Sequence, residues 1–167
     1  MAIEHHAAGC THVWFNGNEY GLSRDGVDIS IDPRWNDIPS DCYGGASGVP
    51  SDSQLLGATA RVTAELTKFE SARVRAAASM DPNALLPAGL GDVQLPAIGS
   101  FVRQGPSPLG GLLDLRGQAF RLSFPFSFLR MPQSFNMGSR ASFYTIGWEC
   151  WLSNETARVL MQYLAAI

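Results

Sequence analysis

Regular alternation of apolar with polar or small residues is the feature that most constrains this sequence. In AFRLSFPFSFLR, residues 119–130, large apolar side chains occupy every second position. The stretches at 140–152 and 55–66 follow the same period. A β-strand places successive side chains on opposite faces, whereas a helix repeats every 3.6 residues. The pattern therefore predicts a chain built mainly from β-strands.

Two shorter strands are expected nearer the start, at 11–15 and 27–31. The second presents apolar side chains on one face and polar side chains on the other: Val27, Ile29 and Ile31 against Asp28, Ser30 and Asp32. Pro33 either ends this alternation or places it at a sheet edge, because proline cannot donate to a ladder. Pro125 interrupts the 119–130 strand and indicates an edge position or a bulge there.

One helix is expected, from Thr67 to Met80. Thr67 can accept hydrogen bonds as an N-cap, and Glu70 follows at the spacing of a capping box. Pro82 would stop the helix. The predicted fold is mainly β, a β-sandwich or open barrel with one central helix and long loops.

The 167 residues fit one structural domain. We expect an N-terminal arm at 1–10, long loops at 36–54 and 82–118, and a C-terminal arm at 153–167. A short strand at 98–103 is possible inside the second loop. The last segment either begins a short helix capped by Ser153 or continues as an extended arm.

Composition narrows the classes of partner. Only 16% of residues are charged, below the roughly 25% usual for soluble domains, which suggests that partners cover some of the surface. Lys68 is the only lysine, so the clustered basic residues of a nucleic-acid reader are lacking. Three widely spaced cysteines do not form a disulfide framework, and we expect reduced thiols. Neither a signal peptide nor a stretch of ~20 apolar residues is visible, so we expect a soluble chain that is not exported.

Catalytic motifs are absent from the sequence. It has no nucleophile elbow, phosphate-binding loop or dinucleotide fingerprint. Cys42 follows Asp41 and lacks the basic neighbour that would lower a thiol pKa. The one candidate metal cluster matches no closed four-ligand spacing and consists of His5, His6, Cys10 and His12. We therefore predict no enzyme, no cofactor and no metal site.

Two further groups of residues are candidates for a functional site. Asp28 and Asp32 share a strand face about 13 Å apart, beyond the roughly 5–9.5 Å of glycosidase carboxylates. They fit a solvated acidic face better than a catalytic pair. The aromatic residues of the last third could line a sugar platform, but at strand spacing they fit a core better. They are Phe120, Phe124, Phe126, Phe128, Trp148 and Trp151.

The order of these features resembles the tail tube proteins of tailed bacteriophages and related virion structural proteins, over roughly residues 26–152. GVDISID is followed by a Gly-rich acidic loop and by LLGATARVTAELTKFE, which is similar to the strand-to-helix junction of those proteins. FRLSFPFSFLRMPQSFNMGSRASFYTIGWECWL is similar to their C-terminal hairpin. The segment 82–117 is longer and richer in proline and glycine than in the simplest tube proteins.

The resemblance implies a structural subunit, not an enzyme, that forms stacked hexameric rings of a tail tube. Strands of neighbouring subunits would close into a barrel around a lumen that conducts the phage DNA without sequence preference during DNA ejection. It implies a virion protein that is assembled in the host cytoplasm, contacts other tail proteins and has no membrane partner. Capsid decoration, a head–tail connector and a tail-tip protein remain alternatives, and a carbohydrate-binding β-sandwich is the rival from another class.

Two sets of residues follow as site candidates. Asp28 and Asp32 would face the lumen, where their charge would repel DNA phosphates. The Gly-rich stretch would form an inter-subunit loop, with candidates Asp41, Tyr43, Gly44, Gly45 and Gly48.

Overall fold

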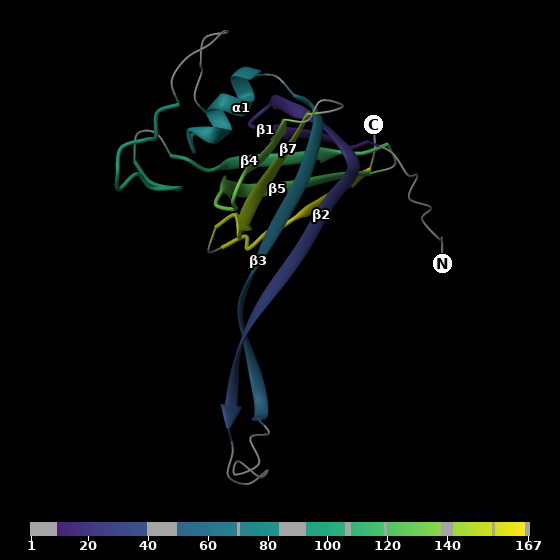
Figure 1. Ribbon diagram of the computed structural model, residues 1–167. Coiled ribbons are helices and arrows are strands. Elements are labelled where there is room, and N and C mark those ends of the chain that lie inside the picture. The colour runs from purple at the N-terminus through teal and green to yellow at the C-terminus, as the bar shows by residue number, and fades with distance from the viewer. Residues whose placement is uncertain are drawn as a thin grey trace.

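The computed structural model describes residues 10–39, 50–69, 71–83, 93–105, 108–118, 120–137, 142–154 and 156–165. Within these ranges the chain has eight strands and one helix (Figure 1). In chain order they are β1 (His12–Phe15), β2 (Asn18–Pro39), β3 (Pro50–Phe69), α1 (Ser71–Ala78), β4 (Gly111–Arg116), β5 (Phe120–Leu129), β6 (Ser134–Met137), β7 (Ser142–Trp151) and β8 (Gln162–Ala165). The predicted mainly β fold with one helix is confirmed.

The strands form one antiparallel sheet in the order β6-β7-β3-β2-β1-β4-β5-β8. β5 also pairs with β7, from Phe126 opposite Trp151 to Leu129 opposite Trp148. This extra pairing joins the two halves of the sheet, so that β7, β3, β2, β1, β4 and β5 form a closed ring of strands. β6 and β8 extend the sheet where β7 and β5 separate. The result is a small barrel with two added strands.

The inside of this barrel holds the core. Alternate residues of β3 are buried, from Ala60 to Leu66, as the period-two pattern predicts. At the centre, the Phe15 ring stacks on Trp148 at 4.6 Å between centroids, and Tyr20 meets the Trp148 ring edge-on at 5.5 Å. The Tyr20 hydroxyl donates to the Pro82 carbonyl at 2.7 Å, which fixes the segment after the helix to the barrel.

The helix is shorter than predicted and starts later. Thr67 belongs to β3, where its hydroxyl donates to the Leu22 carbonyl, so it is not an N-cap. Pairing with β2 continues to Phe69, and ladder bonds there win over local helix propensity. α1 covers the end of the barrel opposite the projecting part of β2 and β3 (Figure 1), and Val74 and Ala77 join the core. In the described ranges no helix is long and apolar enough to cross a membrane.

Other predicted boundaries need correction. The expected loop at 36–54 is wrong at both ends, because β2 runs to Pro39 and β3 begins at Pro50. Inside the expected loop at 82–118, β4 occupies Gly111–Arg116, while the strand suggested at 98–103 is replaced by turns and bends. The expected C-terminal arm folds back instead, since β8 pairs with β5.

Candidate assembly surfaces

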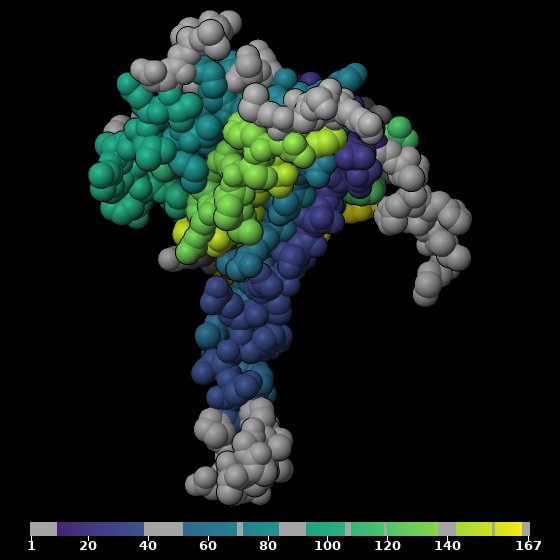
Figure 2. Space-filling view, in the orientation of Figure 1, coloured from purple at the N-terminus to yellow at the C-terminus, as the bar shows by residue number. Residues whose placement is uncertain are grey.

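A two-stranded arm projects from the barrel. We define the arm as residues 32–39 of β2 and 50–59 of β3, which lie beyond the last pairing of β3 with β7 at Ala60. At about 3.3 Å per residue, the β2 part spans roughly 25 Å. Figure 1 shows it leaving the barrel as an isolated hairpin, and Figure 2 shows it as a narrow stalk. An isolated hairpin is only marginally stable in water, and beyond Ala60 no third strand pairs with the arm among the described residues.

One face of the arm continues the apolar interior of the barrel. Ile29 packs against the core, and Ile31 and Trp35 follow on the same face of β2 because side chains alternate. Trp35 lies opposite Leu55, which places both side chains on that face. Outside the barrel nothing among the described residues covers them, and each remains 55% exposed. The arm therefore presents an apolar surface of core type to solvent.

A bulge marks the root of the arm. Arg34 lies opposite Gly57, whereas Trp35 lies opposite Leu55, so Leu56 is an extra residue on β3. Gly57 has a φ of +152°, a backbone conformation that side-chain-bearing residues rarely adopt. Bulges bend a strand and increase its local twist, so the ladder is locally irregular at the root of the arm.

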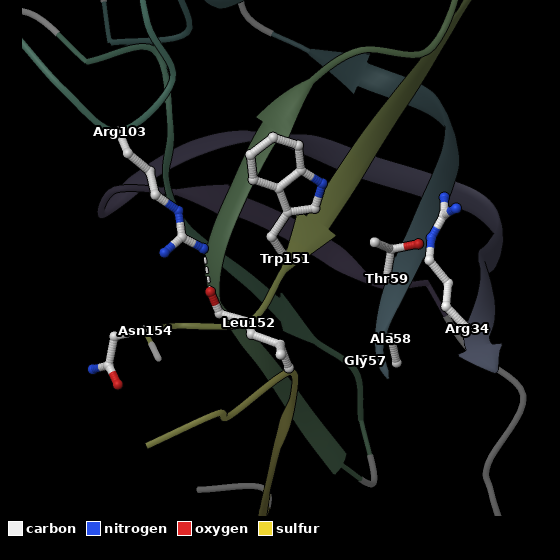
Figure 3. A pocket seen from close by; sticks show the side chains of 8 residues that line it. All are labelled: Arg34, Gly57, Ala58, Thr59, Arg103, Trp151, Leu152 and Asn154. Atoms are coloured by element: carbon white, nitrogen blue, oxygen red, sulfur yellow. Dashed lines mark hydrogen bonds between the residues drawn. The ribbon is translucent and has the colours of Figure 1, made fainter. Parts of the chain in front are cut away.

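A hollow of about 310 Å³ lies beside this root. It is lined by Arg34, Gly57, Ala58, Thr59, Arg103, Trp151, Leu152 and Asn154. Figure 3 shows Arg34 and Thr59 on one side, Arg103 and Asn154 on the other, and the Trp151 ring between them. The hollow thus combines an apolar floor with two guanidinium groups.

Arg103 holds the segment 93–105 against the barrel. Its guanidinium lies 4.1 Å from the Phe126 ring centroid and 5.9 Å from that of Trp151. It also donates to the Ser153 carbonyl at 3.1 Å and to the Leu152 carbonyl. The cation therefore covers the rings that a sugar platform would have to expose. Phe124, Phe128 and Trp148 are buried, as predicted for core residues.

Asp28 and Asp32 lie on the face of β2 that points away from the core. Val27 and Ile29 pack against the core, so alternation directs the two carboxylates outward. Arg61 Nε lies 3.6 Å from Asp32 Oδ2, and Arg24 Nη1 lies 3.6 Å from Glu65 Oε1 nearby. Because arginines accompany the acids, this face repels phosphate less than the sequence suggested. The lumen-facing assignment stays a prediction.

Several strand edges carry no partner within the described ranges. From Val27 to Asp37, the backbone of β2 pairs with β3 alone among the described strands, since β1 reaches only to Leu22. At the other end of the order β6-β7-β3-β2, β6 pairs with β7 alone. Unpaired backbone donors and acceptors along an edge are a template for pairing with another chain. These four strands therefore offer two free edges, one on each side.

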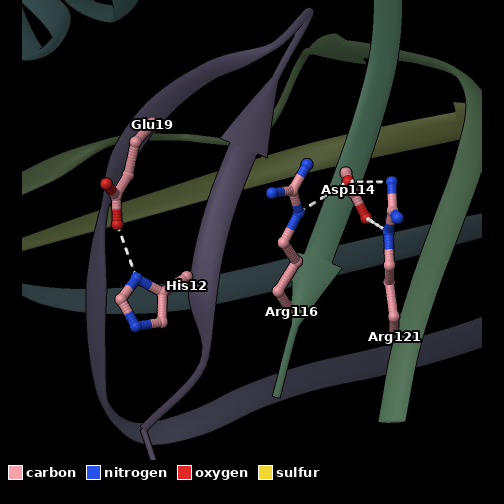
Figure 4. Close-up of polar contacts among 5 residues, drawn as sticks. All are labelled: His12, Glu19, Asp114, Arg116 and Arg121. Carbon is pink, nitrogen blue, oxygen red and sulfur yellow. Dashed lines mark hydrogen bonds and ion pairs between the residues drawn. The ribbon is translucent and has the colours of Figure 1, made fainter. Parts of the chain in front are cut away.

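The remaining candidates are placed only in part. The loop candidates Asp41, Tyr43, Gly44, Gly45 and Gly48, and also Cys42, lie outside the described residues. So do His5 and His6, whereas Cys10 is exposed and His12 Nδ1 lies 2.5 Å from Glu19 Oε1 (Figure 4). Among the described residues no group of three or more potential metal ligands comes together.

A buried carboxylate on β4 went unnoticed in the sequence. Asp114 is 4% exposed and accepts two hydrogen bonds from Arg121, at 2.8 and 2.7 Å, and one from Arg116 Nε at 2.9 Å (Figure 4). The Asp114 hydrogen bond raises the pKa of Arg121. Arg116 also lies 4.4 Å from the Trp14 ring centroid. The cluster ties β4 to β5 and β1, and is structural in character.

Comparison with known proteins does not add a family. No protein-family model matches the chain, and no curated protein matches it.

Neither the arm nor the hollow at its root was predicted from the sequence. The signal that could have found the arm is Trp35 with Leu55 and Leu56, apolar residues on either side of a Gly-rich stretch at hairpin-compatible positions.

Proposed function

We propose that this chain is a structural subunit of a bacteriophage tail tube, which forms rings that stack around a DNA-conducting lumen. The proposal rests on two features described above that have no partner among the described residues. One is the arm, with its exposed apolar face, and the other is the long free edge of β2. Both are surfaces that a second copy can complete.

Ring closure follows from the two free edges. If the free edge of β2 pairs with the free edge of β6 in the next copy, the strands β6-β7-β3-β2 continue from one subunit to the next. The two contacting surfaces differ, so the contact is head-to-tail and closes into a ring when its rotation permits. Closure would remove edges that would otherwise pair indiscriminately.

The lumen wall would then be the outward face of these strands. Asp28, Ser30, Thr63 and Glu65 lie on that face. The face is polar, with arginines beside several of its acids. A polar wall without a cluster of unpaired arginines offers DNA no sequence-specific or strongly attractive contact, which suits passage of a genome.

The alternative functions require different surfaces of the molecule. A decoration, connector or tail-tip subunit would also use the arm and edges, but need not form open-ended stacks. A carbohydrate-binding sandwich would need exposed aromatic faces, and the Phe126 and Trp151 rings lie under Arg103. The one exposed aromatic side chain of the arm, Trp35, lies on a narrow hairpin rather than on a concave surface, which favours assembly over glycan binding.

Negative-stain electron microscopy of the purified chain tests the proposal. We expect rings with a central hole, or tubes. The double variant Trp35→Ser with Leu55→Ser should keep a folded barrel by circular dichroism but lose tubes, because the apolar arm face is removed. Leu112→Ser is the matched control, since Leu112 is an exposed leucine on β4 outside the arm, and it should leave the tubes intact.

Compact monomers of the unmodified chain that bind glycans would refute the tube proposal. Closed particles of fixed size without stacking would instead favour the decoration or connector role.

A further inference from the structure

We infer that the hollow at the root of the arm is a binding site for a small aromatic anion, a ligand that joins a flat ring to a carboxylate or phosphate group. The ring lies against Trp151 and Leu152. The anionic group binds Arg34, and Arg103 adds a second positive charge. The inference goes beyond the proposed function, because it concerns a small molecule and a single copy of the chain.

The floor of the hollow is apolar and held in place. Its lining includes the Trp151 ring, Leu152, Ala58 and Gly57, around a volume of about 310 Å³. Trp151 Nε1 donates to Glu149 Oε1 at 2.9 Å, which fixes the orientation of the indole. Hollows of about 300 Å³ or more with apolar walls and a few polar groups are typical of small-ligand sites. A flat ring therefore finds a preformed surface here.

The charges around this floor are positive and lack a matching acid. None of the eight residues that line the hollow is acidic. Arg34 is exposed and makes no hydrogen bond or ion pair with any residue that the structure describes. The Arg103 guanidinium is held by the Ser153 carbonyl at 3.1 Å and by the Phe126 ring, 4.1 Å from its centroid. A carbonyl oxygen and a ring face leave the charge of Arg103 without a counter-ion, so the hollow favours an anion.

Two further polar groups border the hollow. Asn154 Oδ1 accepts the backbone N–H groups of Thr156 at 3.0 Å and Ala157 at 2.5 Å, which leaves Asn154 Nδ2 as a donor. Thr59 contributes a hydroxyl on the other side of the Trp151 ring (Figure 3). Donors on both sides of the ring favour a charged ligand over its neutral counterpart.

Isothermal titration calorimetry with two matched pairs of probes tests the site. Adenosine monophosphate is compared with adenosine, and 1-naphthoate with 1-naphthalenemethanol, so that the members of each pair share a ring system and differ in charge. We expect the anion of at least one pair to bind about tenfold more tightly than its neutral counterpart, at an ionic strength of about 0.15 M. A preference for adenosine monophosphate identifies a phosphate ligand, and a preference for naphthoate a carboxylate. Equal binding within both pairs would overturn the inference.

Three variants separate the hollow from the rest of the surface. Arg34→Gln should abolish the preference for the anion and leave the neutral probe unaffected, because only the unpaired charge is lost. Ala58→Phe fills the hollow and should weaken both members of a pair. Arg61→Gln is the matched control, since Arg61 lies near Asp32 outside the hollow, and it should bind like the unmodified chain. Equal losses from Arg34→Gln and Arg61→Gln would show diffuse attraction by the surface and would contradict the site.

The double variant Trp35→Ser with Leu55→Ser excludes binding to the apolar face of the arm. In this variant, nuclear magnetic resonance should show probe-induced shifts at the Gly57 amide and at the Trp151 indole N–H. Shifts confined to the exposed apolar residues of Val93–Phe101 would place the probe elsewhere and refute the inference.

The outcomes are independent of those for the proposed function. Tubes formed by an unmodified chain that binds none of the probes would leave the tube proposal standing and remove the ligand site. A monomeric chain that binds an anionic probe through Arg34 would do the reverse.

Discussion

Strands β2 and β3 pass through both the barrel and the arm, and their side chains meet opposite surroundings in the two places. In the barrel Val62 and Leu66 of β3 are fully buried. In the arm Leu55, on the same strand, keeps 55% of its surface exposed, as does Trp35 opposite. Both regions use the same ladder and the same kind of apolar residue. They differ in what covers them, because the barrel residues pack in a core, whereas the arm residues remain largely exposed.

Two matched leucine substitutions give the largest test of this comparison. Leu66→Ala should lower the free energy of unfolding by about 2–5 kcal/mol, because it opens a cavity in a filled core. Leu55→Ala should change it by less than about 0.5 kcal/mol in the isolated subunit, since the side chain is largely in water. Urea denaturation measures both.

A loss of several kcal/mol from Leu55→Ala at a protein concentration that keeps the chain monomeric would contradict the view of an uncovered arm. If the loss appears only at concentrations where the chain assembles, it reports the contact with another copy instead.

This contrast also explains what sequence could predict. The strands at 119–130 and 140–152 were predictable because their apolar residues alternate in the sequence. Burial in β5 does not alternate, however, since residues 122–124 and 127–129 are buried in runs. The arm was not predictable, because Pro33, Pro39 and Pro50 and the polar residues between them are typical of a loop. Their strand conformation depends on pairing across the hairpin. Likewise the sequence at 67–69 favours a helix, yet these residues pair with β2 and form the end of β3.

The same distinction between local sequence pattern and pairing across strands applies to the candidate sites. The outward position of Asp28 and Asp32 was predictable from alternation alone. Their neighbours were not, because Arg61 comes from another strand and its proximity to Asp32 depends on register. The hollow brings Arg34 together with Arg103 and Trp151, residues far apart in the chain, which no local pattern reveals.

Two glycines with nearly the same φ angle sharpen the comparison at a smaller scale. Gly21 in the barrel has a φ of +153° and Gly57 at the arm root has +152°, so alanine is strained at both. At Gly21 the added methyl group would also overlap the Lys68 carbonyl oxygen, whereas at Gly57 the space is open. We expect Gly21→Ala to cost about 3 kcal/mol or more and Gly57→Ala about 1–2 kcal/mol, measured by urea denaturation.

Equal losses at the two glycines would mean that the root of the arm is as tightly packed as the barrel. Gly57→Ala should in addition misdirect the arm, so tubes should shorten even where the barrel remains folded.

Alkaline pH should act on the barrel through a buried thiol. Burial raises the pKa of Cys150 to about 12, although the Ser127 hydroxyl, 3.2 Å from Sγ, acts in the opposite direction. An unfolded chain releases this proton near pH 8.5. Above that pH the unfolded chain binds fewer protons than the folded one, so the free energy of unfolding falls as pH rises. Between pH 8 and 10 we expect a loss of roughly 2 kcal/mol, measured by urea denaturation.

Cys150→Ala isolates this effect, because it removes the titrating group at a cavity cost that is the same at every pH. Its stability should therefore change less between pH 8 and 10 than that of the unmodified chain. An identical slope in the two proteins would show that other groups carry the alkaline sensitivity. Cys150 lies opposite Ala60, where the barrel ends and the arm begins. Local opening there exposes the thiol and lets it ionise, so alkaline pH should favour opening of the arm root before the far end of the barrel. Hydrogen exchange at Ala60 and Val62, compared with Phe15, tests that order.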